Sequence, residues 1–113
     1  MIVKAELPKD TVKTLQTYVA EKIEERGFED ESLQERLLLL VEEVGELTNA
    51  CRKINGMNVD TNRDIENGVG EEIADVINLV FAVGIKLNLD IEKEFIAKNE
   101  KVDKRIYKRA KDQ

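Results

Sequence analysis

Hydrophobic residues recur every three or four positions along most of the chain, a spacing that places them on one face of an α-helix. Stretches rich in Gly, Asn and Asp interrupt this pattern. A first helix is expected to start at a cap formed by Asp10 or Thr11 and to end near Arg26. Three more helices are expected over residues 29–56, 71–87 and 91–109, the last of them capped by Asp90. With no strand pair in the sequence, the pattern predicts an all-α fold.

The third predicted helix decides how the core is built. From Ile73 to Leu87 it is apolar on nearly all sides, and such a helix must be covered by other helices or by a second subunit. Short connections after the first and third helices favour antiparallel neighbours. At 113 residues the chain can build one hydrophobic core but not two. We therefore expect a single domain over residues 1–113, a small four-helix bundle that completes its core by forming a homo-oligomer.

The charge balance argues against two classes of partner. The chain carries 24 Asp and Glu against 18 Lys and Arg, a net charge of -6, whereas binding to nucleic acid or to an anionic membrane needs clustered positive charge. No apolar run approaches the roughly 20 residues of a membrane-spanning helix, and no signal peptide opens the chain. The single Cys51 forms no internal disulfide. We expect a cytoplasmic protein without nucleic-acid or membrane partners.

Carboxylates interrupt the apolar pattern at two places. Glu43 and Glu46 fall within the second predicted helix, and each acidic pair has the i, i+3 spacing that puts both side chains on one helix face. Glu72 and Asp75 form the second pair at the start of the third helix. Glu43 and Glu72 lie among apolar positions, whereas Glu42 points to the opposite side. Facing each other, the two pairs would gather four negative charges in a partly apolar cleft and would need a counter-charge.

The nature of that counter-charge follows from the available ligands. The chain contains no histidine, so acid, base and metal chemistry falls to carboxylates. Oxygen ligands alone favour Mg²⁺ or Mn²⁺, and Mg²⁺ in proteins commonly coordinates substrate phosphates. The alternative is that Glu72 and Asp75 only complement the macrodipole of their helix and that the other acids are solvated. Spacing alone leaves both interpretations open.

A basic segment, residues 98–111, follows the acidic part of the chain. Lys101 and Arg105 share a helix face and are candidates to bind a polyphosphate, or else they are solvated cations favoured near a helix C-terminus. Asn78 in the third helix and Asn99 in the fourth are candidates for hydrogen bonds to a sugar or base, or they are surface or capping amides.

The acidic motifs resemble those of a known family. The stretch "EEVGE" at residues 42–46 followed by "EIAD" at 72–75 resembles the Glu-Glu-x-x-Glu and Glu-x-x-Asp signature of the MazG-like all-α nucleoside triphosphate pyrophosphohydrolases. "KNEKVDKR" at 98–105 is similar to the terminal Asn-x-Lys-x-x-x-Arg element of that superfamily. The resemblance covers roughly residues 33 to 106, and the ordered combination is more specific than any one short motif.

The resemblance implies Mg²⁺-dependent hydrolysis of a nucleoside triphosphate between its α and β phosphates, giving a monophosphate and pyrophosphate. It assigns the metal ligands to four acids: Glu43, Glu46, Glu72 and Asp75. Glu42 matches the leading glutamate, which helps a second ion or positions the water, so Glu42 and Glu43 are the expected catalytic pair. Lys101 and Arg105 match phosphate-binding residues. Relatives are dimers or tetramers of dimers, which implies a homodimer or homotetramer.

Two other functions stay open at this point. The chain fits a non-catalytic helical dimerisation or regulatory module that contacts a partner through its basic segment. It also fits a pyrophosphohydrolase of a specialised substrate such as phosphoribosyl-ATP, because those enzymes have the same acidic motifs. Base preference depends on residues such as Gln16, Asn78 and Asn99, which the sequence does not place in space.

Overall fold

Four helices make up the described part of the chain. The computed structural model describes residues 10–54 and 68–105, and within these ranges it contains no strand. The helices are α1 (Thr11–Glu25), α2 (Leu33–Ile54), α3 (Val69–Lys86) and α4 (Ile91–Asp103). The predicted all-α class is confirmed, whereas residues 55–67, which hold most of the Gly-, Asn- and Asp-rich stretch before the third predicted helix, lie outside the described residues. None of these helices is long and apolar enough to cross a membrane.

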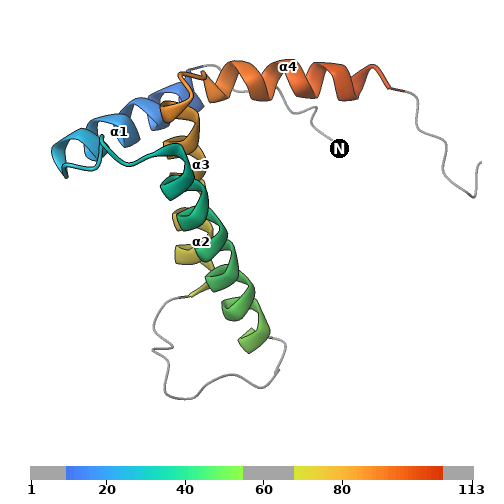
Figure 1. Cartoon of the computed structure of the whole chain (residues 1–113). Coiled ribbons are helices and arrows are strands. Elements are labelled where there is room, and N and C mark those ends of the chain that lie inside the picture. Colours follow the sequence, from blue (N-terminus) through green and yellow to red (C-terminus); the bar gives the residue numbers. More distant parts are fainter. Residues whose placement is uncertain (1–9, 55–67, 106–113) are drawn as a thin grey trace, which may run out of the picture.

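The helices pack as an antiparallel pair with two further helices beside it. Figure 1 shows α2 and α3 running side by side in opposite directions. α1 packs against α3, and α4 contacts α1 while extending away from the α2–α3 pair (Figure 1). The buried apolar residues of this arrangement are few: Ala50, Phe81 and Ala82. The antiparallel pairing brings the middle of α2 opposite the first turns of α3, where the predicted acidic pairs lie.

A glycine and a capping box set the connection between α1 and α2. Gly27 has a φ of 79°, a left-handed conformation that favours glycine and ends α1 where the sequence predicts. Ser32 Oγ accepts a hydrogen bond from the Glu35 N–H at 3.1 Å, and the Glu35 carboxylate accepts one from the Ser32 N–H at 3.4 Å. This reciprocal arrangement starts α2 at Leu33.

The turn between α3 and α4 is held by local and long-range hydrogen bonds. Asn88 has a φ of 56° and ends α3, and Asp90 Oδ1 accepts a hydrogen bond from a first-turn N–H of α4 at 3.2 Å, which confirms the predicted cap. Gln16 of α1 donates from its amide nitrogen to the Leu89 carbonyl at 2.8 Å, and its amide oxygen accepts from the Ile91 N–H at 3.0 Å. Gln16 therefore ties α1 to this turn.

The N-terminus of α1 is capped by a residue far along the chain. Asp10 stands at the N-cap position, but its side chain makes no capping hydrogen bond, so the predicted role of Asp10 is wrong. The buried Glu92 carboxylate instead accepts hydrogen bonds from the N–H groups of Asp10 at 3.0 Å, Val12 at 3.0 Å and Lys13 at 3.4 Å. A carboxylate at this position also complements the helix dipole. Glu92 therefore fixes the start of α4 against the start of α1.

α4 ends earlier than the sequence pattern predicts. The expected helix extends to residue 109, whereas α4 ends at Asp103 and Arg105 closes a turn with a backbone hydrogen bond of 3.0 Å. Glu92 is buried, but none of the described residues after it in α4 is buried, and Phe95 is 50% exposed. Helical stability comes mostly from packing of an apolar face, so the polar end of α4 lacks the contacts that would extend it.

Two apolar stripes stay exposed in the single chain. The stripe on α2 consists of residues at i, i+4 and i+7 spacing: Leu37, Val41 and Val44. The stripe on α3 has the same spacing: Ile73, Ile77 and Val80. Val41 is 70% exposed and Ile77 is 48% exposed, so the nearly all-round apolar surface of α3 is covered only in part within one chain.

Candidate metal centre

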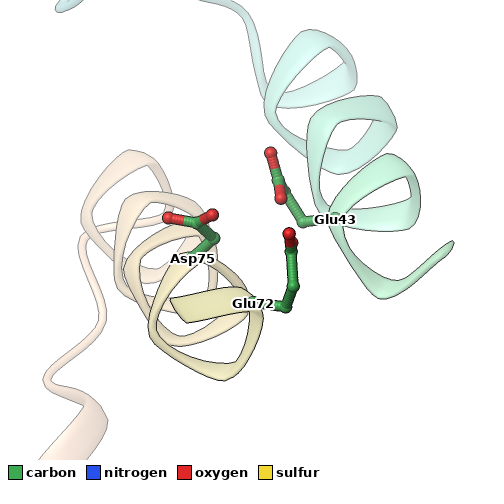
Figure 2. A group of neighbouring side chains, drawn as sticks. All are labelled: Glu43, Glu72 and Asp75. Carbon is green, nitrogen blue, oxygen red and sulfur yellow. The ribbon is translucent and has the colours of Figure 1, made fainter. Parts of the chain in front are cut away.

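Three carboxylates from two helices converge on one point. Glu43 comes from the middle of α2, whereas Glu72 and Asp75 come from the first turns of α3. One carboxylate oxygen from each side chain lies within 4.8 Å of the other two. Figure 2 shows the three side chains pointing into the space between the helices. We call this group, Glu43, Glu72 and Asp75, the acid cluster.

The acid cluster is buried on one side and open on the other. Glu72 is only 5% exposed, Glu43 is half-buried and Asp75 is exposed. Glu72 and Asp75, three residues apart, lie on one side of α3, but only Asp75 is exposed to solvent. A ligand from solvent can therefore reach the cluster past Asp75.

Electrostatic repulsion is concentrated on Glu43. Burial raises the pKa of the Glu43 carboxyl above its ordinary value, and the charges of Asp75 and Glu72 raise this pKa further. Glu42 and Glu46 contribute in the same direction. Without a positive charge in the cluster, Glu43 thus takes up a proton more readily than an ordinary glutamate. A bound cation would reverse this preference.

The donor set of the acid cluster fits a hard divalent cation. Carboxylate oxygens are the ligands that Mg²⁺ and Mn²⁺ prefer, and Mg²⁺ sites in proteins often use one or two carboxylates together with waters and substrate phosphates. Three carboxylates from two helices supply enough oxygen ligands and leave room for such exchangeable ligands. The arrangement lacks a basic side chain of its own, since all three of its members are acids.

The other two predicted acids lie beside the acid cluster. Glu46 is half-buried one turn further along α2, and its carboxylate is not among the three that converge. Glu42 is exposed, in agreement with the prediction that it points to the wetter side. Both are near enough for their charges to raise the pKa of Glu43. They therefore belong to the electrostatic surroundings of the cluster.

The predicted phosphate-binding residues are not brought to the acid cluster within one chain. Lys101 is exposed on α4, and Arg105 is exposed just beyond the end of that helix. Figure 1 shows this part of α4 pointing away from the α2–α3 pair. Asn99, also on α4, donates its side-chain N–H to the Phe95 carbonyl at 2.9 Å, a contact within its own helix. In one chain, the acidic and basic halves of the predicted site are therefore separate.

Asn78 lies elsewhere, on the wall of a cavity that the sequence does not predict. This cavity is bounded by α1, α3 and the segment that connects α1 to α2. Tyr18 and Phe28 also line it, although each is about half exposed. The chain contains only two Tyr and three Phe, but sequence spacing does not show that Tyr18 and Phe28 line the same cavity. Gln16 is engaged by the α3–α4 turn instead.

The comparisons with known proteins leave the family open. No protein-family model matches the chain, and no curated protein matches it. The MazG-like resemblance therefore stays a prediction from the motifs. What the structure adds is the convergence of Glu43, Glu72 and Asp75, three of the four acids that the motifs assign to metal binding.

Proposed function

We propose that the protein is a Mg²⁺-dependent nucleoside triphosphate pyrophosphohydrolase that converts a (d)NTP to a (d)NMP and pyrophosphate. The observation that carries the proposal is the acid cluster, three carboxylate oxygens within 4.8 Å of one another on two antiparallel helices. The resemblance of the same acids to the MazG-like motifs supports it. A free nucleotide substrate also fits the cytoplasmic location expected from the sequence.

The residues of the acid cluster have distinct roles in this proposal. Glu43, Glu72 and Asp75 would hold Mg²⁺ or Mn²⁺, with Glu46 reaching in from the next turn of α2. When bound, the ion would neutralise phosphate charge and lower the pKa of water. The water oxygen attacks the α-phosphorus, the bond from that phosphorus to the bridging oxygen breaks, and pyrophosphate leaves with the bonding electrons.

A carboxylate accepts the water proton, because the chain has no histidine. The resemblance makes Glu42 and Glu43 the expected catalytic pair, and in this proposal Glu43 accepts the proton because it belongs to the acid cluster. Glu42, which precedes Glu43 and is exposed, would orient the water from the solvent side.

A second copy of the chain would complete the site in this proposal. The exposed stripes on α2 and α3 are apolar surfaces of the kind that a partner helix covers. Lys101 and Arg105 lie away from the acid cluster of their own chain, so their proposed contact with the phosphates is made across the interface between copies. We therefore propose a homodimer or homotetramer as the active form.

The reaction is tested with a panel of canonical and modified NTPs and dNTPs, with phosphoribosyl-ATP included, in the presence of Mg²⁺ or Mn²⁺. The products are separated so that monophosphate plus pyrophosphate is distinguished from diphosphate plus phosphate. Release of pyrophosphate with at least one substrate is the expected result. Cleavage only between the β and γ phosphates, or no turnover by a folded protein, would overturn the proposal.

The role of Glu43 is tested by Glu43→Gln, which keeps the shape of the side chain and removes its charge. We expect the substitution to lower kcat about 100-fold or more, because metal binding and proton transfer are both lost. The matched control is Glu71→Gln, which changes an exposed glutamate next to Glu72 outside the acid cluster. Equal activities of wild type and Glu43→Gln, with the fold intact by circular dichroism, would show that the site is elsewhere.

A second candidate function, a non-catalytic helical module, is favoured by the exposed stripes. Such a module has no reason to bind Mg²⁺ and nucleotide together. A thermal unfolding series separates the two candidates, because a ligand that binds only the native state raises its stability in proportion to RT ln(1 + [L]/Kd). A Tm that does not change with millimolar Mg²⁺ and nucleotide would favour the helical module.

A further inference from the structure

A buried arginine near the start of α2 bonds to the facing helix. Arg36 is only 2% exposed, and its Nη1 donates a hydrogen bond of 2.6 Å to the Ala82 carbonyl in the last third of α3. Its Nη2 donates to the Phe28 carbonyl at 3.2 Å, and its Nε lies 3.9 Å from Glu31 Oε1. A guanidinium presents its donors in a rigid plane, so these contacts together fix the position of α2 relative to α3 and to the α1–α2 connection.

The Arg36 contact and the acid cluster lie on the same helix faces. Arg36 precedes Glu43 by seven residues on α2, and Ala82 follows Asp75 by seven residues on α3. Seven residues make almost two turns, so the members of each pair share a face and are separated by about 10.5 Å along the axis. Because α2 and α3 are antiparallel (Figure 1), these equal steps run in the same direction in space. One register therefore produces both the Arg36 hydrogen bond and the convergence of Glu43 with Asp75.

The side chains between these two contacts do not specify a register by themselves. Half-buried aliphatic residues lie there on the same faces: Leu40, Val76 and Leu79. Aliphatic contacts are non-directional, so a slip by one helical turn would replace one such contact with another. The carboxylates of the acid cluster repel one another and do not hold the helices together without a cation. A buried polar contact, by contrast, is the kind of interaction that specifies register between packed helices.

We propose that Arg36 is a positioning residue of the candidate metal centre. Its hydrogen bond to the Ala82 carbonyl sets the register of α2 and α3, and this register places Glu43 opposite Asp75 so that both carboxylates reach one cation. Residues that orient metal ligands without touching the ion change metal affinity by about 10- to 100-fold when they are replaced. The effect on the cation rests on the proposed function, whereas the effect on the register does not.

The register is tested by cross-linking, without metal or substrate. Glu43→Cys is combined with Asp75→Cys in a Cys51→Ser background, which removes the native exposed thiol, and the rate of cross-linking by a short bismaleimide is measured. A second pair, Glu43→Cys with Leu79→Cys, reports a register shifted by about one turn. With Arg36 present we expect the 43–75 pair to react faster than the 43–79 pair.

Arg36→Met tests whether Arg36 causes this preference. Methionine keeps an unbranched, apolar stem but donates no hydrogen bond, so we expect the ratio of the two cross-linking rates to fall to about 1. Arg36→Lys, which replaces the planar guanidinium with a single ammonium, should lower the ratio part of the way. A folded Arg36→Met protein with the original ratio would overturn the inference. Where only Arg36→Lys folds, an unchanged ratio in that variant would overturn it.

The link to the metal centre is tested by Mn²⁺ binding to the full chain, followed by electron paramagnetic resonance. We expect Arg36→Met to weaken Mn²⁺ binding about 10-fold or more. Glu92→Ala is the control, because it removes the cap of α1 but leaves the Arg36 hydrogen bond in place, and its affinity should stay within about 2-fold of wild type. Equal weakening in the two folded variants would show a general loss of stability and overturn the positioning role.

The two measurements separate failure of this inference from failure of the proposed function. If Mn²⁺ binds to wild type and to folded Arg36→Met with the same affinity, the positioning role is refuted and the metal centre stands. If Mn²⁺ does not bind to the folded wild-type protein, the metal centre is refuted together with the positioning role. In that case the cross-linking ratio still decides whether Arg36 sets the register of α2 and α3.

Discussion

Glu43 shows how the position of one residue can work against the stability of the fold. Its carboxylate is half-buried among like charges, an arrangement that destabilises the fold unless a proton or a cation is bound. In the proposed function, a bound cation would offset this cost.

The pH dependence of stability follows from the raised pKa of Glu43. Between the ordinary glutamate pKa and the raised one, the native state holds a proton that the unfolded state has lost, so the free energy of unfolding falls as pH rises through this window. We expect the Tm of the metal-free protein in EDTA to fall with rising pH, and Glu43→Gln to be more stable than wild type by about 2 to 4 °C above the window.

The measurement is a set of thermal unfolding curves between about pH 4 and 8, with and without saturating Mg²⁺. Mg²⁺ competes with the proton, so its stabilising effect on wild type should grow as pH rises, while Glu43→Gln should respond weakly. Glu71→Gln serves as the control. Parallel pH profiles for wild type and Glu43→Gln would contradict the assignment of the raised pKa to Glu43.

Arg36 is the second residue with a large expected effect on stability. Arg36→Ala leaves the Phe28 and Ala82 carbonyls without their donor and Glu31 without its nearby positive charge. We expect a loss of about 3 kcal/mol in the free energy of unfolding from urea titration. Arg105→Ala, which truncates an exposed arginine, should change it by less than about 0.5 kcal/mol. Similar effects of the two substitutions would show that the buried contacts contribute little.

At the residue scale, sequence spacing could predict the acid cluster but not the burial of Arg36. Glu43, Glu72 and Asp75 are visible because acids at i, i+3 stand out within apolar helices. Arg36 looks like an ordinary surface residue of a charged helix. Its burial depends on carbonyl groups of Phe28 and Ala82, which only the tertiary fold brings together.

At the scale of helices, local signals predicted most boundaries and missed one long-range cap. Gly27 and Asp90 act as the sequence predicts, because their effects depend on neighbouring backbone groups. The cap of α1 by Glu92 was missed, since nothing near Asp10 indicates a carboxylate from another helix. The C-terminal end of α4 was misplaced because helical periodicity does not reveal whether a face finds a partner.

Removal of the Glu92 cap should loosen both helices that it joins. We expect Glu92→Ala to lower the free energy of unfolding by about 2 kcal/mol and to speed hydrogen exchange at the Val12 and Lys13 amides, which lose their acceptor. Glu94→Ala, an exposed glutamate in the same turn of α4, is the matched control. Unchanged exchange at both amides in Glu92→Ala would show that water replaces the carboxylate without cost.

At the scale of the whole molecule, one chain does not cover its own apolar surface. Few apolar residues are buried within the described ranges, while the stripes on α2 and α3 face outward. The sequence predicted this incompleteness from the apolar surface of α3, but it could not show which residues stay exposed, because that depends on where α1 and α2 pack. A second copy is the partner that the proposed function requires.

Assembly is tested by charges placed in the stripes. We expect the wild-type protein to be a dimer or tetramer by light scattering, and Val41→Asp or Ile77→Asp to shift it toward monomer with helical content retained, because a buried charge opposes association. Leu15→Asp changes a half-exposed leucine of α1 outside both stripes and should leave the assembly intact. A wild-type monomer at tens of micromolar protein would contradict the proposed assembly.

The Glu92 cap also has a consequence for the order in which the protein folds during synthesis. Between 79 and 82 residues separate Glu92 from the amides that it caps. At translation rates of about 5 to 20 residues per second, the ribosome needs roughly 4 to 16 s to add that length. Until then α1, a 15-residue helix, lacks this cap and is marginal by itself. α1 is the first helix to be synthesised, but it gains the Glu92 cap only after α2 and α3 have emerged and can pair.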